Sequence, residues 1–448
     1  MIFFDYSIKN FRKKVSPVPS REQVMWYNAS IGKRKEATEM KFLHISDLHL
    51  GKILHNLSLV EGGDQSFWLE QLLHFVDTDR PDAVLISGDV YDRGVPPKEA
   101  TLLLDRMLTE LAGKRDLPVL MIAGNHDGGE RLNFGADLLR NVYLSGLVSK
   151  ELKHVTFEDE YGPVTFWLMP YIFPAAVREL LGVGQEEIPD YDAAARALLA
   201  EQRIDFGERN VLLTHQFIVN GKQSPISSDS ESTVGGVGAI DYHAFDGFDY
   251  VALGHIHGAQ AIGRDSVRYA GAPLCYHFSE IGQKKGILSV SLGRKGSEPE
   301  IRLEELPVLH GMRNISGAFE DIVKQESVSD NRNEYVRVVL TDEEPVYDAA
   351  DTLRSIFEAH GTRMLDLAFE PQKKRQEKEQ GAPEARRNKP IWELFEDYYY
   401  DQKGQFLSEK DSILIRTLSG EILNDADKQD SQIADDIVKL VYQQEENA

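Results

Sequence analysis

The sequence contains almost no cysteine and no long apolar run, and each absence narrows the class of protein. Its 448 residues include a single cysteine, Cys275, which excludes an internal disulfide framework and a cysteine-based zinc site. This usage is typical of a reducing compartment, so we predict a cytoplasmic protein. No apolar stretch approaches the roughly 20 residues that a membrane-spanning helix needs, and no membrane association is expected.

Positive charge is also scarce. There are 50 Lys and Arg against 73 Asp and Glu, which gives a formal net charge of −23. Taken alone, this balance argues against nucleic acid as a ligand, because phosphate binding normally relies on basic surface. The phosphate-binding motif GxxxxGK[ST] is absent as well, so any dependence on ATP would have to come from a partner.

The first 39 residues differ in character from the rest of the chain. They are polar and mildly basic, without helical or strand periodicity and without the apolar core of a signal peptide. A clean strand pattern, KFLHISD, follows Met40 directly. We therefore expect residues 1–39 to be a disordered or non-native extension, with Met40 as the alternative start.

From Met40 onward, short apolar runs alternate with amphipathic stretches. Helical periodicity occurs over residues 66–76 and 98–111, and a loop rich in Ser and Gly is expected over residues 221–238. The apolar runs that predict strands cover residues 42–45, 83–86, 119–123, 211–214 and 250–253. This alternation predicts an α/β layered domain, which we place at residues 40–295.

The pattern changes near residue 300, where a small α+β domain is predicted over residues 300–372. Its expected strands and helices cover residues 301–309, 319–324, 335–340, 349–359 and 364–369. Residues 373–389 are highly charged and contain Gly and Pro, which is typical of a linker. Amphipathic helices are expected in residues 390–448.

Five polar motifs follow or close the strand-like runs: SDLHLG (46–51), GDVYDRG (88–94), GNHD (124–127), LLTHQ (212–216) and GHIH (254–257). In an α/β sheet, ligands gather beyond the carboxyl ends of the strands. The motifs could therefore bring seven side chains together: Asp47, His49, Asp89, Asn125, His215, His255 and His257. In DLH and HIH, the two outer residues share one face of an extended segment, and Leu48 and Ile256 can pack the opposite way.

Carboxylate, amide and imidazole groups without a thiolate suit Mn, Fe, Zn or Mg. Seven ligands exceed the need of one ion, and a carboxylate that bridges two ions about 3.5–4 Å apart would account for them. Each motif alone is more often structural, as a turn, a helix N-cap or a surface histidine. Five of them at strand ends together favour a metal centre.

The motif set resembles the metallophosphoesterase superfamily, whose pattern is DxH, GDxxD, GNHD or GNHE, H and GHxH. The flanking text (SDLHLGK, PDAVLISGDVYDRGVPPKEA, AGNHDGGERL and DYVALGHIH) further resembles the SbcD family of nuclease subunits. Leu48 stands where that family usually has Trp. The resemblance covers residues 40 to about 279, and beyond them only the layout is similar. It implies a layered β-sandwich flanked by helices, a small α+β capping domain over the DNA site, and C-terminal helices (390–448) that dock on a partner, with folding back on their own chain as the alternative.

The resemblance also implies two divalent metal ions, expected to be Mn²⁺. The first ion would be held by Asp47, His49, Asp89 and His257. The second would be held by Asp89, Asn125, His215 and His255, with Asp89 as the bridge.

Other motif residues are expected to act around the ions. His126 would be the general acid or a phosphate stabiliser. Asp92 would support His126, with a surface salt bridge as the alternative. Gly88 and Gly94 would let the backbone turn tightly around the two carboxylates. Arg131 is a candidate contact for phosphate, or equally an ordinary surface arginine.

Three further features have open roles. His44 could support the first ligands from within the core. His277 follows GAPLCY, which resembles a family loop near the active site. The tyrosines at 398–400 could stack on bases, but packing of a helix face or a partner is the better interpretation.

The implied function is a metal-dependent DNA nuclease that works with an SbcC-type ATPase, as a homodimer within a heterotetramer. It would be an exonuclease on duplex ends and an endonuclease on single strands or hairpins. One alternative is a stand-alone phosphodiesterase or phosphatase on a smaller phosphoester, although residues 300–448 exceed what that requires. A non-catalytic scaffold is the other, although the complete ligand set speaks against it. The metal ions and the basic residues of a partner could offset the acidity of this chain.

Overall fold

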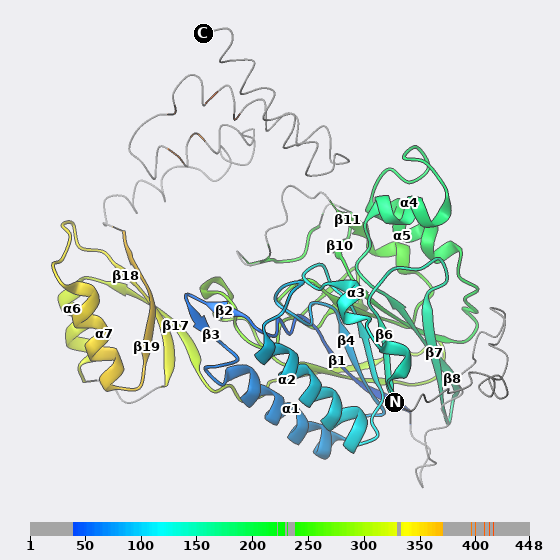
Figure 1. Ribbon diagram of the computed structural model, residues 1–448, viewed down its shortest axis with the longest axis horizontal. Helices are drawn as coiled ribbons and strands as arrows, with labels where there is room; N and C mark the ends of the chain where they lie inside the picture. Colours follow the sequence, from blue (N-terminus) through cyan, green and yellow to red (C-terminus); the bar gives the residue numbers. More distant parts are fainter. Residues whose placement is uncertain are drawn as a thin grey trace, which may run out of the picture.

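The computed structural model describes residues 39–370 apart from 222, 229–230, 232–237 and 329–332, and beyond them five single residues, 396, 399, 407, 412 and 415. Two six-stranded sheets and a separate three-stranded sheet form its framework (Figure 1). The predicted α/β class is confirmed. The expected N-terminal extension up to residue 38, the linker at 373–389, and the C-terminal helices with Tyr398 and Tyr400 lie outside the described residues.

The first sheet contains the three strands that were predicted at residues 42–45, 83–86 and 119–123. Its spatial order is β16 (Glu300–Glu304), β15 (Ile287–Leu292), β1 (Met40–Ile45), β4 (Ala83–Ser87), β5 (Val119–Ile122) and β6 (Val142–Ser145). The last four are parallel, whereas β15 runs antiparallel to β1 and to β16. Both faces of the parallel strands are covered, which explains their almost uninterrupted apolar runs.

The second sheet repeats this parallel arrangement. Its order is β13 (Gln260–Ile262), β14 (Arg264–Tyr269), β12 (Tyr250–Gly254), β9 (Arg209–His215), β8 (Gly162–Met169) and β7 (Lys153–Asp159). Strands β14, β12, β9 and β8 are parallel, and β7 and β13 are antiparallel edges. The predicted strands at 211–214 and 250–253 are confirmed as β9 and β12.

The two sheets pack face to face, with helices on the outer faces. Between them, the Phe42 ring meets Phe166 and Tyr250 edge-on, at centroid distances of 5.6 and 5.5 Å. Helices α1 (Asp64–Asp79) and α2 (Lys98–Leu108) cover the first sheet. Helices α4 (Pro174–Leu181) and α5 (Tyr191–Ala200) cover the second. The buried aromatic layer holds the two sets of parallel strands in one orientation.

Short elements complete the core. The predicted helix at 98–111 begins as α2 and continues as the π-helical η1 (Thr109–Lys114). The remaining elements are β2 (Ile53–Leu54), β3 (Leu57–Ser58), α3 (Gly129–Leu132), η2 (Ala136–Leu138), β10 (Phe217–Val219), β11 (Ala239–Asp241), η3 (Tyr242–Phe245) and η4 (Phe278–Glu280).

A small βαβαβ unit follows the core and is drawn in yellow in Figure 1. Its parallel strands are β17 (Gly311–Gly317), β18 (Glu334–Leu340) and β19 (Arg363–Phe369), and its helices are α6 (Phe319–Glu326) and α7 (Ala349–Ala359). The helices pack on one face of the sheet around a core of their own. We call residues 311–369 the capping unit.

The strand predicted over residues 301–309 is wrong in extent and in placement. Only residues 300–304 form a strand, β16, and β16 pairs with β15 in the first sheet rather than with the capping unit. Pro307 then follows, and a proline has no N–H to donate to a sheet. The sequence analysis missed β17, because its residues GMRNISG show little apolar alternation. The domain limits as a whole stay a prediction.

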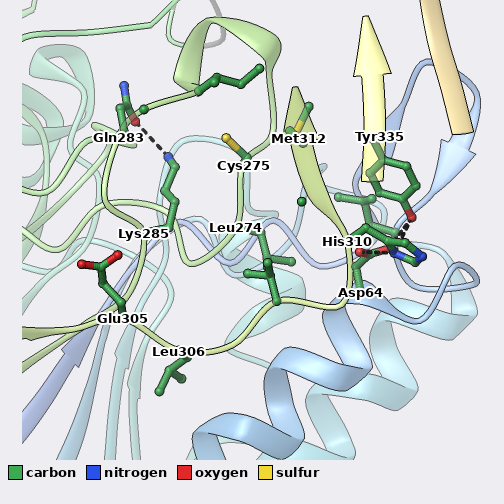
Figure 2. Close-up of a pocket in the computed structure, with 15 residues that line it drawn as sticks. Asp64, Leu274, Cys275, Gln283, Lys285, Glu305, Leu306, His310, Met312 and Tyr335 are labelled. Carbon is green, nitrogen blue, oxygen red and sulfur yellow. Dashed lines mark hydrogen bonds and ion pairs between the residues drawn. The ribbon is translucent and has the colours of Figure 1, made fainter. Parts of the chain in front are cut away.

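The capping unit meets the core at the first turn of α1. Asp64 accepts hydrogen bonds from the Tyr335 hydroxyl (2.7 Å) and from His310 Nδ1 (2.8 Å) (Figure 2). A cavity of about 260 Å³ lies beside these contacts, between the capping unit and the residues around Lys285. The junction therefore combines this polar contact with a small cavity and with apolar packing of Tyr335, Met312 and Leu365 against the core.

Candidate metal centre

The parallel strands bring all five motifs to one end of the sandwich. SDLHLG follows β1, GDVYDRG follows β4 and GNHD follows β5, all in the first sheet. In the second sheet, His215 is the last residue of β9, and Gly254, which opens GHIH, lies opposite it on β12. The predicted convergence of the motifs on one place is therefore what the topology produces.

Four of the predicted ligands have backbone conformations that L-residues rarely adopt. The φ angles are 52° at Asp47, 42° at His49, 47° at Asp89 and 104° at His255. Such conformations cost on the order of 1–3 kcal/mol each and persist where the surrounding structure imposes them, often at functional sites. Here they occur where the chain leaves a strand and turns a ligand side chain inward.

A first cluster contains Asp47, His49 and His257, whose ligand atoms all lie within 4.8 Å of one another. The Nε2 atoms of His49 and His257 are 3.2 Å apart. His49 Nε2 lies 3.6 Å from Asp89 Oδ2, so Asp89 borders this cluster. All four residues are almost completely buried. These are the residues predicted for the first ion.

A second cluster lies on the other side of Asp89. His215 Nε2 is 3.2 Å from Asp89 Oδ2 and 3.1 Å from Asn125 Oδ1. His255 Nδ1 is 3.0 Å from the same Asn125 oxygen. One carboxylate oxygen of Asp89 thus lies near both clusters, which is the position that the predicted bridge requires.

The orientation of the histidines fits two cations. His257 Nδ1 is 2.9 Å from a Glu280 carboxylate oxygen, and His215 Nδ1 is 2.8 Å from the Ser87 carbonyl oxygen. Both oxygens can only accept a hydrogen bond, so each Nδ1 carries the proton. In a neutral ring, Nε2 then carries a lone pair. The lone pair of His215 then faces the oxygens of Asp89 and Asn125. Acceptors that converge in this way need a cation between them.

The pKa shifts agree with this arrangement. Burial opposes a charge on His215, but the Asp89 carboxylate overcomes it and raises the pKa of His215 to about 9. A proton on His215 therefore stands in for a cation when no metal is bound. Burial, reinforced by His215, lowers the pKa of His255 to about 3, which keeps His255 neutral, as a metal ligand must be.

His126 lies at the exposed rim beside the first cluster. Its backbone N–H donates to Asp89 Oδ1 (2.9 Å), and its Nδ1 donates to the backbone oxygen of Asp92 (3.0 Å). The ring stands edge-on to His49, with 4.8 Å between centroids. The bond to Asp92 leaves Nε2 as the nitrogen available to a substrate.

Asp92 reaches His126 through the main chain and uses its carboxylate elsewhere. The carboxylate lies 2.9 Å from Lys52 Nζ and 3.5 Å from His49 Nδ1. Burial opposes ionisation, but the hydrogen bonds from His49 and Lys52 lower the pKa of Asp92 to about 2. Asp92 thus contacts His126 with its backbone oxygen and pairs with Lys52 through its carboxylate, and its role in supporting His126 during catalysis stays a prediction.

The two glycines of GDVYDRG differ in backbone conformation. Gly88 has φ +87°, and a Cβ there would lie 2.3 Å from His215 Nδ1, so the ring needs a glycine at this position. Gly94 also lies in a bend of the chain, but its φ is not positive and a Cβ there would have ordinary contact distances, so nothing in this turn requires a glycine.

The remaining candidates are not members of either cluster. Arg131 is exposed on α3, and its side chain makes no hydrogen bond or ion pair with any other described residue. His44 is buried between the sheets, with Nδ1 2.9 Å from the Tyr250 hydroxyl. His277 accepts the backbone N–H of Ser279 and so caps its own turn. Arg131 as a phosphate contact stays a prediction.

The sequence analysis missed the residues that hold the ligand loops. Gln65 donates to the carbonyl oxygens of Leu48 (3.1 Å) and His49 (2.8 Å) and accepts the N–H of Gly51 (3.0 Å). Its only signal was a polar residue at a helix start, which usually faces solvent. Glu280, which contacts His257, carried no recognisable signal.

Asp127 is the last residue of the GNHD motif, and the sequence analysis assigned it no role. Its carboxylate accepts three backbone N–H groups, from Val90 (3.1 Å), Tyr91 (2.8 Å) and Gly124 (2.9 Å). It thereby ties the loop that carries Asp89 to the loop that carries Asn125. Its position in the motif was visible in the sequence, but these partners were not.

Two ligand clusters that share a carboxylate, at the strand ends of a two-sheet sandwich, define a metallophosphoesterase. Residues 40–259 match the calcineurin-like phosphoesterase family, and residues 308–403 match a family described as the type 5 capsule protein repressor C-terminal domain. The SbcD subunit of the SbcCD nuclease from Staphylococcus epidermidis is 34% identical over 322 residues, which cover 71% of this chain and 83% of that protein. The chain belongs to the SbcD family.

Two solved structures are also similar. TT1561 of Thermus thermophilus has a TM-score of 0.35 at 13% identity, and a dimetal phosphatase from Danio rerio has a TM-score of 0.32 at 12% identity. Each match covers 59% of this chain and 99% of the other. At these scores neither likeness supports a conclusion by itself.

Among the described residues, no helix combines the length and apolar character that crossing a lipid bilayer requires.

Proposed function

We propose that this chain is the nuclease subunit of a DNA-processing complex and hydrolyses phosphodiester bonds with two divalent metal ions, Mn²⁺ in the first place. The observation that carries the proposal is the pair of ligand clusters on either side of Asp89. The relative from Staphylococcus epidermidis, named a nuclease subunit, supports DNA as the substrate.

The chemistry divides between the ions and the chain. Bound ions would activate a water molecule and screen the negative charge of the phosphodiester. Asp47, His49, Asp89 and His257 would hold one ion, and Asp89, Asn125, His215 and His255 the other. With protons on both ring nitrogens, His126 would give the Nε2 proton to the leaving oxygen and become neutral, or would stabilise the phosphate. The Nδ1–H bond to Asp92 fixes its tautomer and ring orientation.

We extend the proposal to exonuclease action on duplex ends and endonuclease action on single strands or hairpins, in DNA repair, recombination and replication. The basis is membership of the SbcD family. Asn125 and His126 are exposed at the rim of the clusters, which is compatible with a polymeric substrate that approaches from outside.

An SbcC-type ATPase is the proposed partner, and it would supply two things that this chain lacks. The sequence has no nucleotide-binding motif of its own, and its net charge of −23 disfavours DNA away from the metal centre. Basic residues of the ATPase would then form much of the DNA-binding surface. If so, the isolated chain binds duplex DNA weakly and with a shallow salt dependence.

A homodimer is the proposed assembly of this chain within a heterotetramer. Four apolar side chains between residues 134 and 147 are exposed: Phe134 (89%), Leu138 (88%), Leu139 (45%) and Leu147 (47%). Such a local concentration of exposed apolar groups is typical of an interface. Phe134→Ser with Leu138→Ser should convert a dimer to a monomer in light scattering. A wild-type monomer at micromolar concentration would contradict the proposal.

The first experiment measures release of nucleotides from end-labelled duplex DNA by the purified chain with Mn²⁺. We expect release by the wild type, none with a chelator, and a fall of about 10²–10⁴-fold in His126→Ala, because a general acid contributes that much. Manganese binding should be unchanged in this variant, since His126 is not a ligand.

The outcomes separate the alternatives. If the wild type releases nothing alone but does so with the ATPase, the partner is required. If DNA stays intact in both cases while a small phosphodiester is hydrolysed, the function is that of a stand-alone phosphodiesterase. Full activity in Asp89→Ala would remove the metal mechanism altogether.

A further inference from the structure

The segment from Tyr276 to Lys285 lies against both histidines of the first cluster. The Tyr276 ring is edge-on to His49 and His257, with centroid distances of 5.5 and 5.7 Å. Its hydroxyl donates to the Leu48 carbonyl oxygen at 2.5 Å. One short segment far along the chain from His49 therefore forms the wall behind this half of the site.

Glu280 is the charged group of that wall, and it is fully buried. One carboxylate oxygen accepts the Nδ1–H of His257 at 2.9 Å. The other accepts the backbone N–H of Tyr276 at 3.1 Å and lies 2.7 Å from Lys285 Nζ. A buried carboxylate stays charged only with such partners, and these partners strongly lower the pKa of Glu280 despite its burial.

Lys285 locks Glu280 and the backbone of His257 together. Besides Glu280, its amino group contacts the carbonyl oxygen of His257 (2.9 Å) and Gln283 Oε1 (3.0 Å). The three protons of an ammonium group thus have three acceptors. Figure 2 shows Lys285 on the wall of the cavity next to the capping unit, with its contact to Gln283.

We propose that Glu280, held by Lys285, is the positioning residue that makes His257 a metal ligand. By accepting the Nδ1 proton, Glu280 selects the tautomer in which Nε2 carries a lone pair, and it aims that lone pair at the gap beside His49 Nε2. A carboxylate behind a histidine also makes the ring a stronger ligand. The inference rests on the metal centre of the proposed function.

Glu231 is a second carboxylate on the Nδ1 side of His257, and its contact is of a different kind. It accepts the backbone N–H of His257, whereas its oxygen is 3.8 Å from Nδ1. A bond to the backbone holds the loop but does not choose the tautomer. Glu280 is therefore the residue that sets the ring.

The test is a titration of the metal-free full chain with Mn²⁺ by calorimetry. We expect two ions on the wild type, and in Glu280→Ala a 10–100-fold loss of affinity for one of them, which is the usual effect of removing such a partner. The matched control is Glu326→Ala, because Glu326 is also buried and paired with an arginine, Arg313 (3.0 Å), in the capping unit. Wild-type affinity in Glu280→Ala, or an equal loss in Glu326→Ala, would overturn the inference.

A second variant guards against simple misfolding. Lys285→Met keeps Glu280 and the length of the side chain but removes the lock, so the same affinity should fall by less than in Glu280→Ala, and Lys285→Arg should recover part of it. Unfolding temperatures in a chelator show whether each variant is folded. If Glu280→Ala does not fold, an unchanged affinity in Lys285→Met decides against the inference.

The titration uses no DNA, so it separates this inference from the nuclease proposal. A wild type that binds two ions but never cleaves DNA would contradict the nuclease and leave the role of Glu280 intact. Wild-type affinity for both ions in Glu280→Ala would contradict the role of Glu280 and leave the nuclease proposal intact. A wild type that binds fewer than two ions would overturn both.

Discussion

The histidines on the two sides of Asp89 differ in the group that accepts their Nδ1 proton, which is charged on one side and neutral on the other. In the first cluster, His257 is backed by the Glu280 carboxylate at 2.9 Å, and Nδ1 of His49 lies 3.5 Å from the Asp92 carboxylate. In the second cluster, His215 is backed by the Ser87 carbonyl oxygen at 2.8 Å, a neutral group.

This difference predicts that the two clusters bind their ions with unequal affinity. A histidine whose second nitrogen bonds to a carboxylate is a stronger donor than one bonded to a carbonyl. The second cluster also includes Asn125, which is exposed and contributes a neutral oxygen. The first cluster should therefore hold its ion more tightly, and the second should exchange its ion more readily.

The largest effect is expected from Asp89→Ala, which breaks the comparison by removing the group common to both clusters. Both manganese affinities and the nuclease activity should fall to background, since each cluster loses a carboxylate. Calorimetry and nucleotide release measure the two losses. Asp77→Ala, which removes an exposed carboxylate paired with Arg115, is the control and should change neither.

A pair of single variants sharpens the comparison next. His257→Ala should abolish the tighter phase of manganese binding, and His215→Ala the weaker phase, each leaving the other phase measurable. A titration followed by the paramagnetic signal of free Mn²⁺ resolves the two phases. The idea of unequal support fails if His215→Ala removes the tighter phase.

A smaller effect is expected from Asp92→Asn. The change removes the charge near His49 but keeps the backbone oxygen that orients His126, so the tighter affinity should weaken by less than in Glu280→Ala. At saturating Mn²⁺, kcat should stay close to the wild-type value. A kcat that stays low at saturation would instead assign the carboxylate itself to the support of His126.

The smallest effect concerns His44, a buried histidine outside both clusters. Burial, with a contribution from Arg268, lowers its pKa to about 3, against about 6.5 in the unfolded chain. His44 is neutral when folded, and below pH 6.5 only the unfolded state takes up the proton. The free energy of unfolding should therefore fall as pH drops from about 6.5 to about 3, by at most about 1.4 kcal/mol per pH unit.

Urea unfolding at pH 7 and pH 5 measures this contribution. The fall between the two pH values should be smaller in His44→Phe than in the wild type. His74→Gln, at an exposed position on α1, serves as the control and should keep the wild-type fall. Equal falls in all three proteins would show that His44 does not contribute.

Sequence patterns predicted most of the fold that positions the site. Strands β1, β4, β5, β9 and β12 were predicted because a strand buried on both faces is a continuous apolar run. The hairpin of β7 and β8 was not predicted: the edge strand β7 mixes polar and apolar residues, whereas the inner strand β8 was missed although it carries an apolar run. Strand β16 was assigned to the wrong sheet, because the residue pattern of a strand does not indicate which strand it pairs with.

The sequence by itself identified the candidate ligands, since each of them stands next to a strand in a motif of four to seven residues. Only the tertiary structure decided which groups stand behind those ligands. Glu280 reaches His257 across 23 positions, and Gln65 reaches the carbonyl oxygen of Leu48 across 17. A motif is local and can be read from neighbouring residues, whereas a contact between distant segments exists only after the sheets and helices have packed.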